Sequence, residues 1–244
     1  MSPATLPQWP GRTARLAGTL TFLVGTLALV GWALDVPTFK RVLPQSPEMA
    51  PLTALAFCLS GLALWCLAIA RAGCAGGGTA RPPSVWLWVG RGLAVLVAFI
   101  GLLRLGYYLA GSNLGLDQFW FREATGPAGA AFPSRTSPAT ALDFLFLGGA
   151  LLLAGQARWF RVFQFSALVA GLIGWLGFSH YFYGGEPLLP YSGMAFHTAL
   201  AFLMLSAGLL CTRPDGGLVA LLISPTTGGA IARRGPLAAR PEDE

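Results

Sequence analysis

The chain has 244 residues, of which 55% are hydrophobic and only 11% are charged, and its formal net charge is +6. Because soluble domains usually carry about a quarter charged residues, this composition excludes an ordinary water-soluble globule. The positive charge does not indicate a nucleic-acid partner, since the arginines are scattered at the ends of apolar segments and are not clustered in one stretch.

Six apolar segments follow one another along the chain, and each is close to the roughly 20 residues that cross a bilayer as a helix. The runs are continuous and do not alternate, which is typical of helices and not of barrel strands. We therefore predict an all-α polytopic membrane protein with six transmembrane helices. They cover residues 16–34, 52–70, 85–110, 139–155, 162–183 and 194–211.

One five-residue pattern opens every second predicted helix. It reads Thr-Ala-Leu-x-Phe at residues 53–57, 140–144 and 198–202. A unit that recurs three times marks the architecture, and we interpret it as a hairpin of two antiparallel helices. Equivalent helices keep their direction, so the hairpins are parallel repeats and not the inverted repeats of many transporters. The repeats cover residues of about 16–70, 85–155 and 162–211.

Basic residues divide unequally between the two sides of this topology. Most of them fall in the N-terminal tail (residues 1–15), in the loops between hairpins and in residues 213–244. The opposite loops hold only Lys40, Arg41, Arg122 and Arg135, mixed with acidic residues. By the positive-inside rule, both termini are expected in the cytoplasm. Residues 213–244 then form a cytoplasmic interfacial segment with a polar tail.

Four ionisable side chains lie inside predicted helices, where charged groups are costly and indicate function by default. Arg104 lies about 9 Å inward from the outer end of its helix, and Asp143 about 6 Å. His180 and His197 each lie about one turn inward. All four share the depth of the outer leaflet, so we interpret them as the lining of a polar pocket framed by tyrosines. These are Tyr107, Tyr108, Tyr181, Tyr183 and Tyr191.

An alternative interpretation needs no pocket. Arg104 and Asp143 would form an ion pair that holds the second hairpin together, while the tyrosines and tryptophans make the interfacial aromatic belt.

The two histidines also suggest haem, with His180 and His197 as axial ligands from neighbouring helices. One histidine per helix with no second pair disfavours this, so we expect no cofactor. We expect no metal either, because the cysteines lack ligand spacing. Motifs for a nucleophile or a phosphate loop do not occur in the sequence, so we do not expect an enzyme. The cysteines are Cys58, Cys66, Cys74 and Cys211.

Several stretches resemble a known family when taken together. They are Gly-Trp-Ala-Leu-Asp at residues 31–35, Met-Ala-Pro-Leu-Thr-Ala-Leu-Ala-Phe at 49–57, Tyr-Ser-Gly-Met-Ala-Phe-His-Thr-Ala at 191–199 and Gly-Gly-Ala-Ile-Ala-Arg-Arg at 228–234. They resemble the multi-pass N-terminal membrane region that precedes PAS and histidine kinase domains, and sometimes diguanylate cyclase domains, in bacterial sensor proteins. The resemblance extends over residues of about 16–234.

The resemblance implies a sensory input module in the bacterial inner membrane, with His197 inside the family-like pattern. It also implies a cytoplasmic kinase or cyclase partner, and we expect a homo-oligomer in the lipid bilayer. After residue 234 the chain continues only into a polar tail, so we expect no catalytic domain of its own. A structural subunit of a larger membrane complex and a small-solute transporter are the alternatives.

Overall fold

The structure is a computed structural model that describes residues 9–43, 46–75, 84–110, 136–183, 193–213 and 216–223. These residues form eight helices and no strand, in agreement with the predicted all-α class. The helices are α1 (Trp9–Ala33), α2 (Pro37–Lys40), α3 (Pro51–Ala75), α4 (Ser84–Ala110), α5 (Pro138–Leu153), α6 (Phe160–Tyr183), α7 (Phe196–Cys211) and α8 (Gly217–Ile223).

Four of these helices, α1, α3, α4 and α6, are long and apolar enough to cross a membrane. Large apolar side chains are exposed along them, for example Leu23 on α1, Phe99 on α4 and Phe165 on α6. A surface of this kind suits lipid and not water. The chain is therefore a helical, membrane-embedded protein.

The two remaining predicted spans are shorter than expected. Helices α5 and α7 have 16 residues each, which corresponds to about 24 Å at 1.5 Å per residue. The hydrocarbon core of a bilayer is about 30 Å thick. By length alone the structure supports four spans, and the crossing of α5 and α7 stays a prediction. Helix α1, by contrast, begins at Trp9, inside the predicted N-terminal tail.

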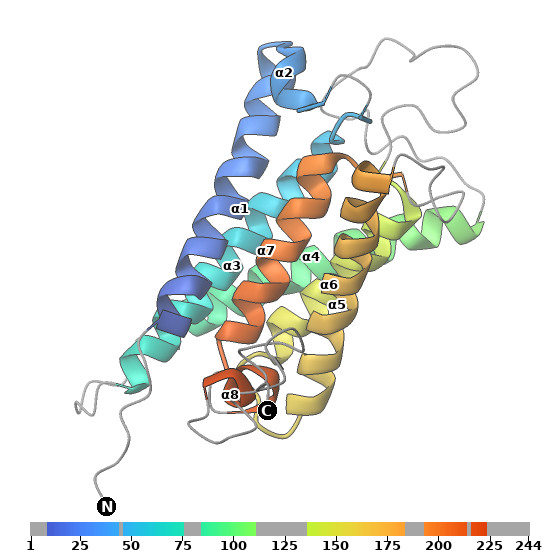
Figure 1. The fold of residues 1–244 in the computed structure, drawn as a ribbon. Helices are drawn as coiled ribbons and strands as arrows, with labels where there is room; N and C mark the ends of the chain where they lie inside the picture. Colours follow the sequence, from blue (N-terminus) through green and yellow to red (C-terminus); the bar gives the residue numbers. More distant parts are fainter. Residues whose placement is uncertain are drawn as a thin grey trace, which may run out of the picture.

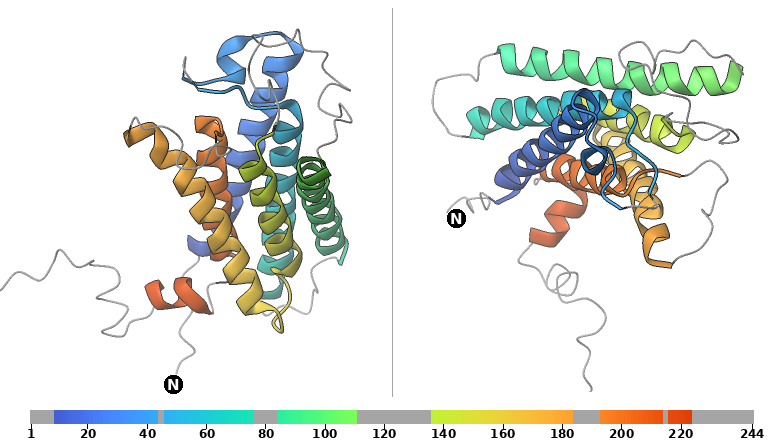
Figure 2. Two further views of the ribbon diagram at one scale, coloured as in Figure 1. Left: turned by 90° about the vertical axis from the view of Figure 1, so that its right-hand side faces the viewer. Right: turned by 90° about the horizontal axis from the view of Figure 1, so that it is seen from above.

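Six helices form a closed ring of contacts in the order α1, α3, α4, α5, α6, α7 and back to α1. Helices α3, α5 and α7 also contact one another, so they form the inner layer of the bundle. Helix α4 lies along one side, as the view from above shows (Figure 2). Helix α2 lies at one end of the bundle and α8 at the other (Figure 1). Following the predicted topology, we call these the outer and the inner end.

Each of the pairs α1/α3, α4/α5 and α6/α7 contains a glycine, on its first helix, that packs against the start of the second helix. A Cβ added to that glycine would meet the backbone carbonyl of the alanine in the Thr-Ala-Leu-x-Phe pattern. Small residues at such points let membrane helices pack backbone to backbone, so these contacts set the register of each pair. The separations between that Cβ and the carbonyl oxygen are 2.6 Å for Gly25 and Ala54, 2.7 Å for Gly101 and Ala141, and 3.3 Å for Gly174 and Ala199.

The phenylalanines that end the repeated pattern meet between α3, α5 and α7. The ring centroids of Phe57 and Phe144 are 5.0 Å apart, and Phe202 lies 4.8 Å from each of them. All three side chains are fully buried. The tilted and edge-on ring arrangements are those that aromatic rings prefer. The pattern that marks three helix starts in the sequence is therefore also the centre of the core.

The outer connection between α1 and α3 folds back on the helix ends. Lys40, at the end of α2, is buried with its Nζ 4.2 Å from the centroid of the Trp32 ring and 2.6 Å from a carboxylate oxygen of Asp35. Met49 is buried beside them. The hydrogen bond from Lys40, together with its positive charge, lowers the pKa of the Asp35 carboxyl below its ordinary value. This loop therefore lies on the bundle.

Candidate functional site

Asp143 is an ionisable side chain in the centre of the bundle. Ser137 caps α5 by accepting a hydrogen bond from the backbone N–H of Thr140, and Asp143 follows in the second turn. The other two repeats have Ala56 and Ala201 at this place, and all three side chains are fully buried. Neither carboxylate oxygen of Asp143 accepts a hydrogen bond from a residue that the structure describes.

A buried carboxyl group without a hydrogen-bond partner opposes the stability of the fold. The equivalent alanines show that the packing at this position needs no polar group. Ionisable residues in such places are functional by default in membrane proteins. Asp143 is therefore the most informative residue of the candidate site.

The ion pair between Arg104 and Asp143 is not formed, so that interpretation was wrong. Arg104 is buried on α4, one turn beyond Gly101. The contact of Gly101 with Ala141 turns Ala141 toward α4, and Asp143, two residues later, is rotated by about 200° around its helix. In this antiparallel register Asp143 also lies roughly 7 Å deeper than Arg104 along the axis. Asp143 thus faces away from α4.

The two histidines lie on neighbouring helices at the outer end. His197 is buried, and neither of its ring nitrogens has a hydrogen-bond partner among the residues that the structure describes. His180 is partly exposed and its ring centroid lies 5.5 Å from that of Tyr181. Within the described ranges no hydrogen bond joins either histidine to Asp143. Groups of three His, Cys, Asp or Glu side chains that would hold a metal ion are also absent there.

Two of the tyrosines expected in the pocket have a structural role. The hydroxyl of Tyr181 donates a hydrogen bond of 2.6 Å to the Met194 carbonyl, and that of Tyr108 donates one of 2.5 Å to Thr136. Tyr108 lies seven residues after Gly101, and Tyr181 lies seven residues after Gly174; these are the glycines that pack against the following helix. Of the others, Tyr107 is partly buried, Tyr183 is exposed and Tyr191 lies outside the described residues.

The first repeat has the same bond with an indole as donor. Trp32, seven residues after Gly25, donates from Nε1 to the Met49 carbonyl at 2.8 Å. The carbonyls that accept these three bonds belong to residues five positions before the alanine of each pattern. In each repeat the aromatic ring donor therefore ties the first helix to the segment before the second. A sequence signal for this bond exists, because the aromatic residue follows a glycine at a constant distance of seven residues in all three repeats.

The inner end of the bundle holds a second polar cluster. Arg71, near the end of α3, donates hydrogen bonds to the Thr212 carbonyl that follows α7 and, at 2.6 Å, to the Ala154 carbonyl that follows α5. Arg213 also donates to Ala154, at 3.2 Å. Cations are favourable at helix C-termini, where unpaired carbonyls carry partial negative charge. In the sequence, basic residues at these places indicate only the orientation of the chain in the membrane.

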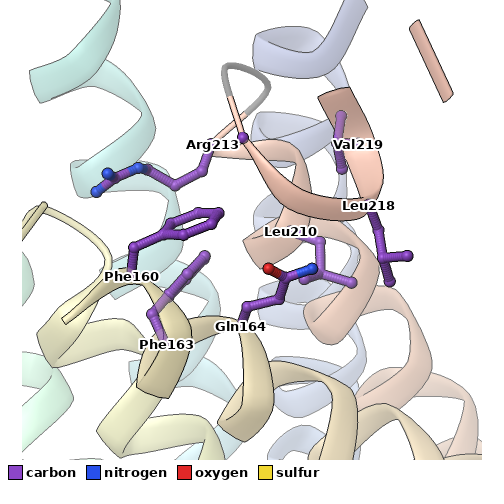
Figure 3. Close-up of a pocket in the computed structure, with 8 residues that line it drawn as sticks. Phe160, Phe163, Gln164, Leu210, Arg213, Leu218 and Val219 are labelled. Atoms are coloured by element: carbon purple, nitrogen blue, oxygen red, sulfur yellow. The ribbon is translucent and has the colours of Figure 1, made fainter. Parts of the chain in front are cut away.

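A shallow hollow, open to solvent, lies beside this cluster between α6, α7 and α8. Figure 3 shows that Arg213 points away from α8 and lies over the ring of Phe160, 5.1 Å from its centroid. Asp143, Arg104 and the two histidines do not line this hollow. The lining residues are Phe160, Phe163, Gln164, Leu210, Arg213, Gly216, Leu218 and Val219.

Models of protein families, curated proteins and solved structures gave no match to this chain. The geometry alone defines the candidate site, which consists of Asp143 in the core and of the arginines at the inner ends of the central helices.

Proposed function

We propose that this chain is a membrane-embedded sensory input module of a bacterial signal-transduction system, with the outer half of the bundle as its sensing part. The observation that carries the proposal is Asp143, a fully buried carboxyl group with no hydrogen-bond partner among the described residues, where the other repeats have alanine. A group that destabilises the resting bundle at this depth is suited to respond to protons, ions or a ligand.

The proposal includes six spans in three parallel hairpins, α1/α3, α4/α5 and α6/α7, around an axis through Phe57, Phe144 and Phe202. Three equivalent glycine contacts and three equivalent hydrogen bonds from aromatic rings support this arrangement. Helices α5 and α7 can be short because α3 and their neighbours in the ring surround them. Both termini would face the cytoplasm of a bacterial inner membrane, where arginines near the helix ends are favoured.

A mechanical connection between the two ends supports the sensing role. Helix α5 carries Asp143 in its second turn and ends at the carbonyl of Ala154, which Arg71 and Arg213 both contact. Arg213 belongs to the segment between α7 and α8. A rotation or shift of α5 at the outer end would change these bonds and move α8, which we regard as the output end. A cytoplasmic kinase or cyclase is the partner we propose, with the chain acting as a homo-oligomer.

The core favours an input module over the transporter alternative. Phe57, Phe144 and Phe202 fill the space between α3, α5 and α7 on the axis. Transport along that axis would require these rings to separate at once, with the loss of a large part of the core packing. A small rotation of one helix keeps the rings in contact.

The test measures whether Asp143 controls the position of α8. Spin labels are attached at Val162→Cys on α6 and Leu221→Cys on α8, both exposed, in a background without the native cysteines. We expect the distance distribution between the labels in lipid nanodiscs to differ between the parent protein and Asp143→Asn. The control is Glu48→Gln, which removes an outer-loop carboxylate and should leave the distances unchanged. Identical distributions in all three proteins would refute the coupling that the proposal requires.

Membrane topology is tested separately. Reporter enzymes that are active only in the periplasm or only in the cytoplasm are fused after residues 45, 80, 122, 157 and 188. Six spans predict periplasmic activity after 45, 122 and 188 and cytoplasmic activity after 80 and 157. If the reporters after residues 122 and 157 were active on the same side, α5 would not cross the membrane.

A further inference from the structure

Three guanidinium groups surround the turn that follows α5. Arg71 from α3 and Arg213 from the segment after α7 both donate to the carbonyl of Ala154. Arg91 comes from α4, and its Nη2 lies 3.6 Å from the position that a Cβ on Gly155 would occupy. Arginines from three separate parts of the fold therefore converge on residues 154–155.

Among the described residues, no carboxylate lies close to this cluster of guanidinium groups. Guanidinium groups stay protonated in proteins. The C-termini of α5 and α7 provide about half a negative charge each, and Arg71 and Arg213 donate hydrogen bonds to carbonyls there. Asp35 and Glu48 belong to the outer loop, and Asp143 lies about 16 Å from the end of α5 along the helix. The Nε of Arg91 is buried and makes no hydrogen bond to a described residue.

Tryptophans place the cluster at the depth of lipid headgroups. Trp88 is 66% exposed and its ring centroid lies 5.6 Å from Cζ of Arg91, while Trp159, in the turn before α6, is 46% exposed beside Arg158. Indole rings concentrate at the interface between membrane and water. Val95 and Leu96, about one turn deeper in the membrane than Arg91 on α4, are exposed and apolar. A ligand here would meet guanidinium groups at one end and apolar surface at the other.

We propose that the turn after α5 binds the phosphate of an anionic phospholipid, of the phosphatidylglycerol or cardiolipin class. Arg91 and Arg213 would donate to the phosphate, while Arg71 holds the helix ends and adds positive charge. Basic pockets between transmembrane helices bind such headgroups because phosphate oxygens accept the paired N–H donors of arginine. Val95 and Leu96 would lie along the acyl chains. The site does not depend on the sensory role of Asp143.

The experiment uses the purified full chain in a mild detergent. Phosphatidylglycerol or phosphatidylcholine is titrated in, and bound lipid is counted by native mass spectrometry while the thermal midpoint is recorded. We expect phosphatidylglycerol to bind and raise the midpoint, and phosphatidylcholine to do neither. Arg91→Gln should weaken phosphatidylglycerol binding at least about tenfold, since an arginine–phosphate contact is charge-assisted and directional. Inorganic phosphate should have no effect, because it lacks the acyl chains.

Arg12→Gln is the matched control, because Arg12 is an exposed arginine at the same end of the bundle on α1. It should bind phosphatidylglycerol like the parent protein. Arg213→Lys serves as a second test variant that keeps the charge but loses the forked donor, and it should bind more weakly. The proposal is refuted if phosphatidylglycerol and phosphatidylcholine bind equally well. It is also refuted if Arg91→Gln binds phosphatidylglycerol like the parent protein, or if Arg12→Gln weakens that binding as much as Arg91→Gln does. A response to inorganic phosphate equal to that of the lipid would show a free-anion site instead.

Discussion

The hydroxyl of Tyr181 donates a hydrogen bond of 2.6 Å to the backbone carbonyl of Met194. This bond joins the outer end of α6 to the segment that enters α7, and Met194 is buried. The second repeat has the same bond from Tyr108, and the first has it from Trp32. A buried carbonyl needs a donor, and here each repeat supplies one from the aromatic side chain of its own first helix.

Removal of this donor should destabilise the bundle. Tyr181→Phe leaves the Met194 carbonyl without its partner, and we expect a loss of about 1 kcal/mol in the free energy of unfolding. Tyr183→Phe is the matched control, because Tyr183 is 86% exposed and should cost nothing measurable. Reversible unfolding in mixed micelles measures both variants. Equal stability of the two variants would contradict the role of the bond.

Truncation of the central phenylalanines should have a larger effect. Phe202→Ala opens a cavity beside Phe57 and Phe144, and we expect a loss of about 3 kcal/mol, the low end for such changes because lipid replaces water outside the bundle. Phe182→Ala, on the 71% exposed Phe182 of α6, should change stability by less than about 0.5 kcal/mol. The thermal midpoints in one detergent compare them. If Phe202→Ala and Phe182→Ala lost similar amounts of stability, the three central phenylalanines would not be the centre of the core.

Asp143→Ala should stabilise the protein. The change removes a buried carboxyl group that has no described hydrogen-bond partner and restores the residue of the other repeats. We expect a gain of about 1–2 kcal/mol. The converse change, Ala201→Asp, should lose at least as much, because it buries a carboxyl group at the equivalent place. Destabilisation by Asp143→Ala would show that Asp143 has a stabilising partner.

Acid should weaken the outer loop through Asp35. The hydrogen bond from Lys40, aided by its charge, lowers the pKa of Asp35 below 3.8 in the folded protein. The stabilisation is therefore complete above the ordinary pKa and is lost as the pH falls through the lowered one. At pH 6 the thermal midpoint of the parent protein should be slightly higher than that of Asp35→Asn, and this difference should disappear toward pH 2. Asn is chosen because Asp35 has a φ of 54°, which Asn also tolerates. A gap that does not depend on pH would contradict the assignment.

The helices themselves were largely readable from the sequence. Continuous apolar runs predict a membrane helix wherever they occur, and the predicted 85–110 and 162–183 match α4 and α6 within two residues. The three copies of Thr-Ala-Leu-x-Phe also marked α3, α5 and α7 at their first turns. These features are local, because they depend on the composition and spacing of neighbouring residues. The extension of α1 back to Trp9 was missed, since polar residues continue that helix beyond its apolar part.

The relations between side chains were decided by the packing. Arg104 and Asp143 are close in predicted depth, but the contact of Gly101 with Ala141 fixes the rotation of α5 and turns Asp143 away from α4. The partners of Arg71 are the carbonyls of Ala154 and Thr212, which lie 83 and 141 residues away along the chain. The sequence alone determined that the chain is a bundle of apolar helices with an internal repeat. Which faces of those helices meet depends on close backbone contacts at single glycines, and hydropathy does not encode them, so only the tertiary structure decided them.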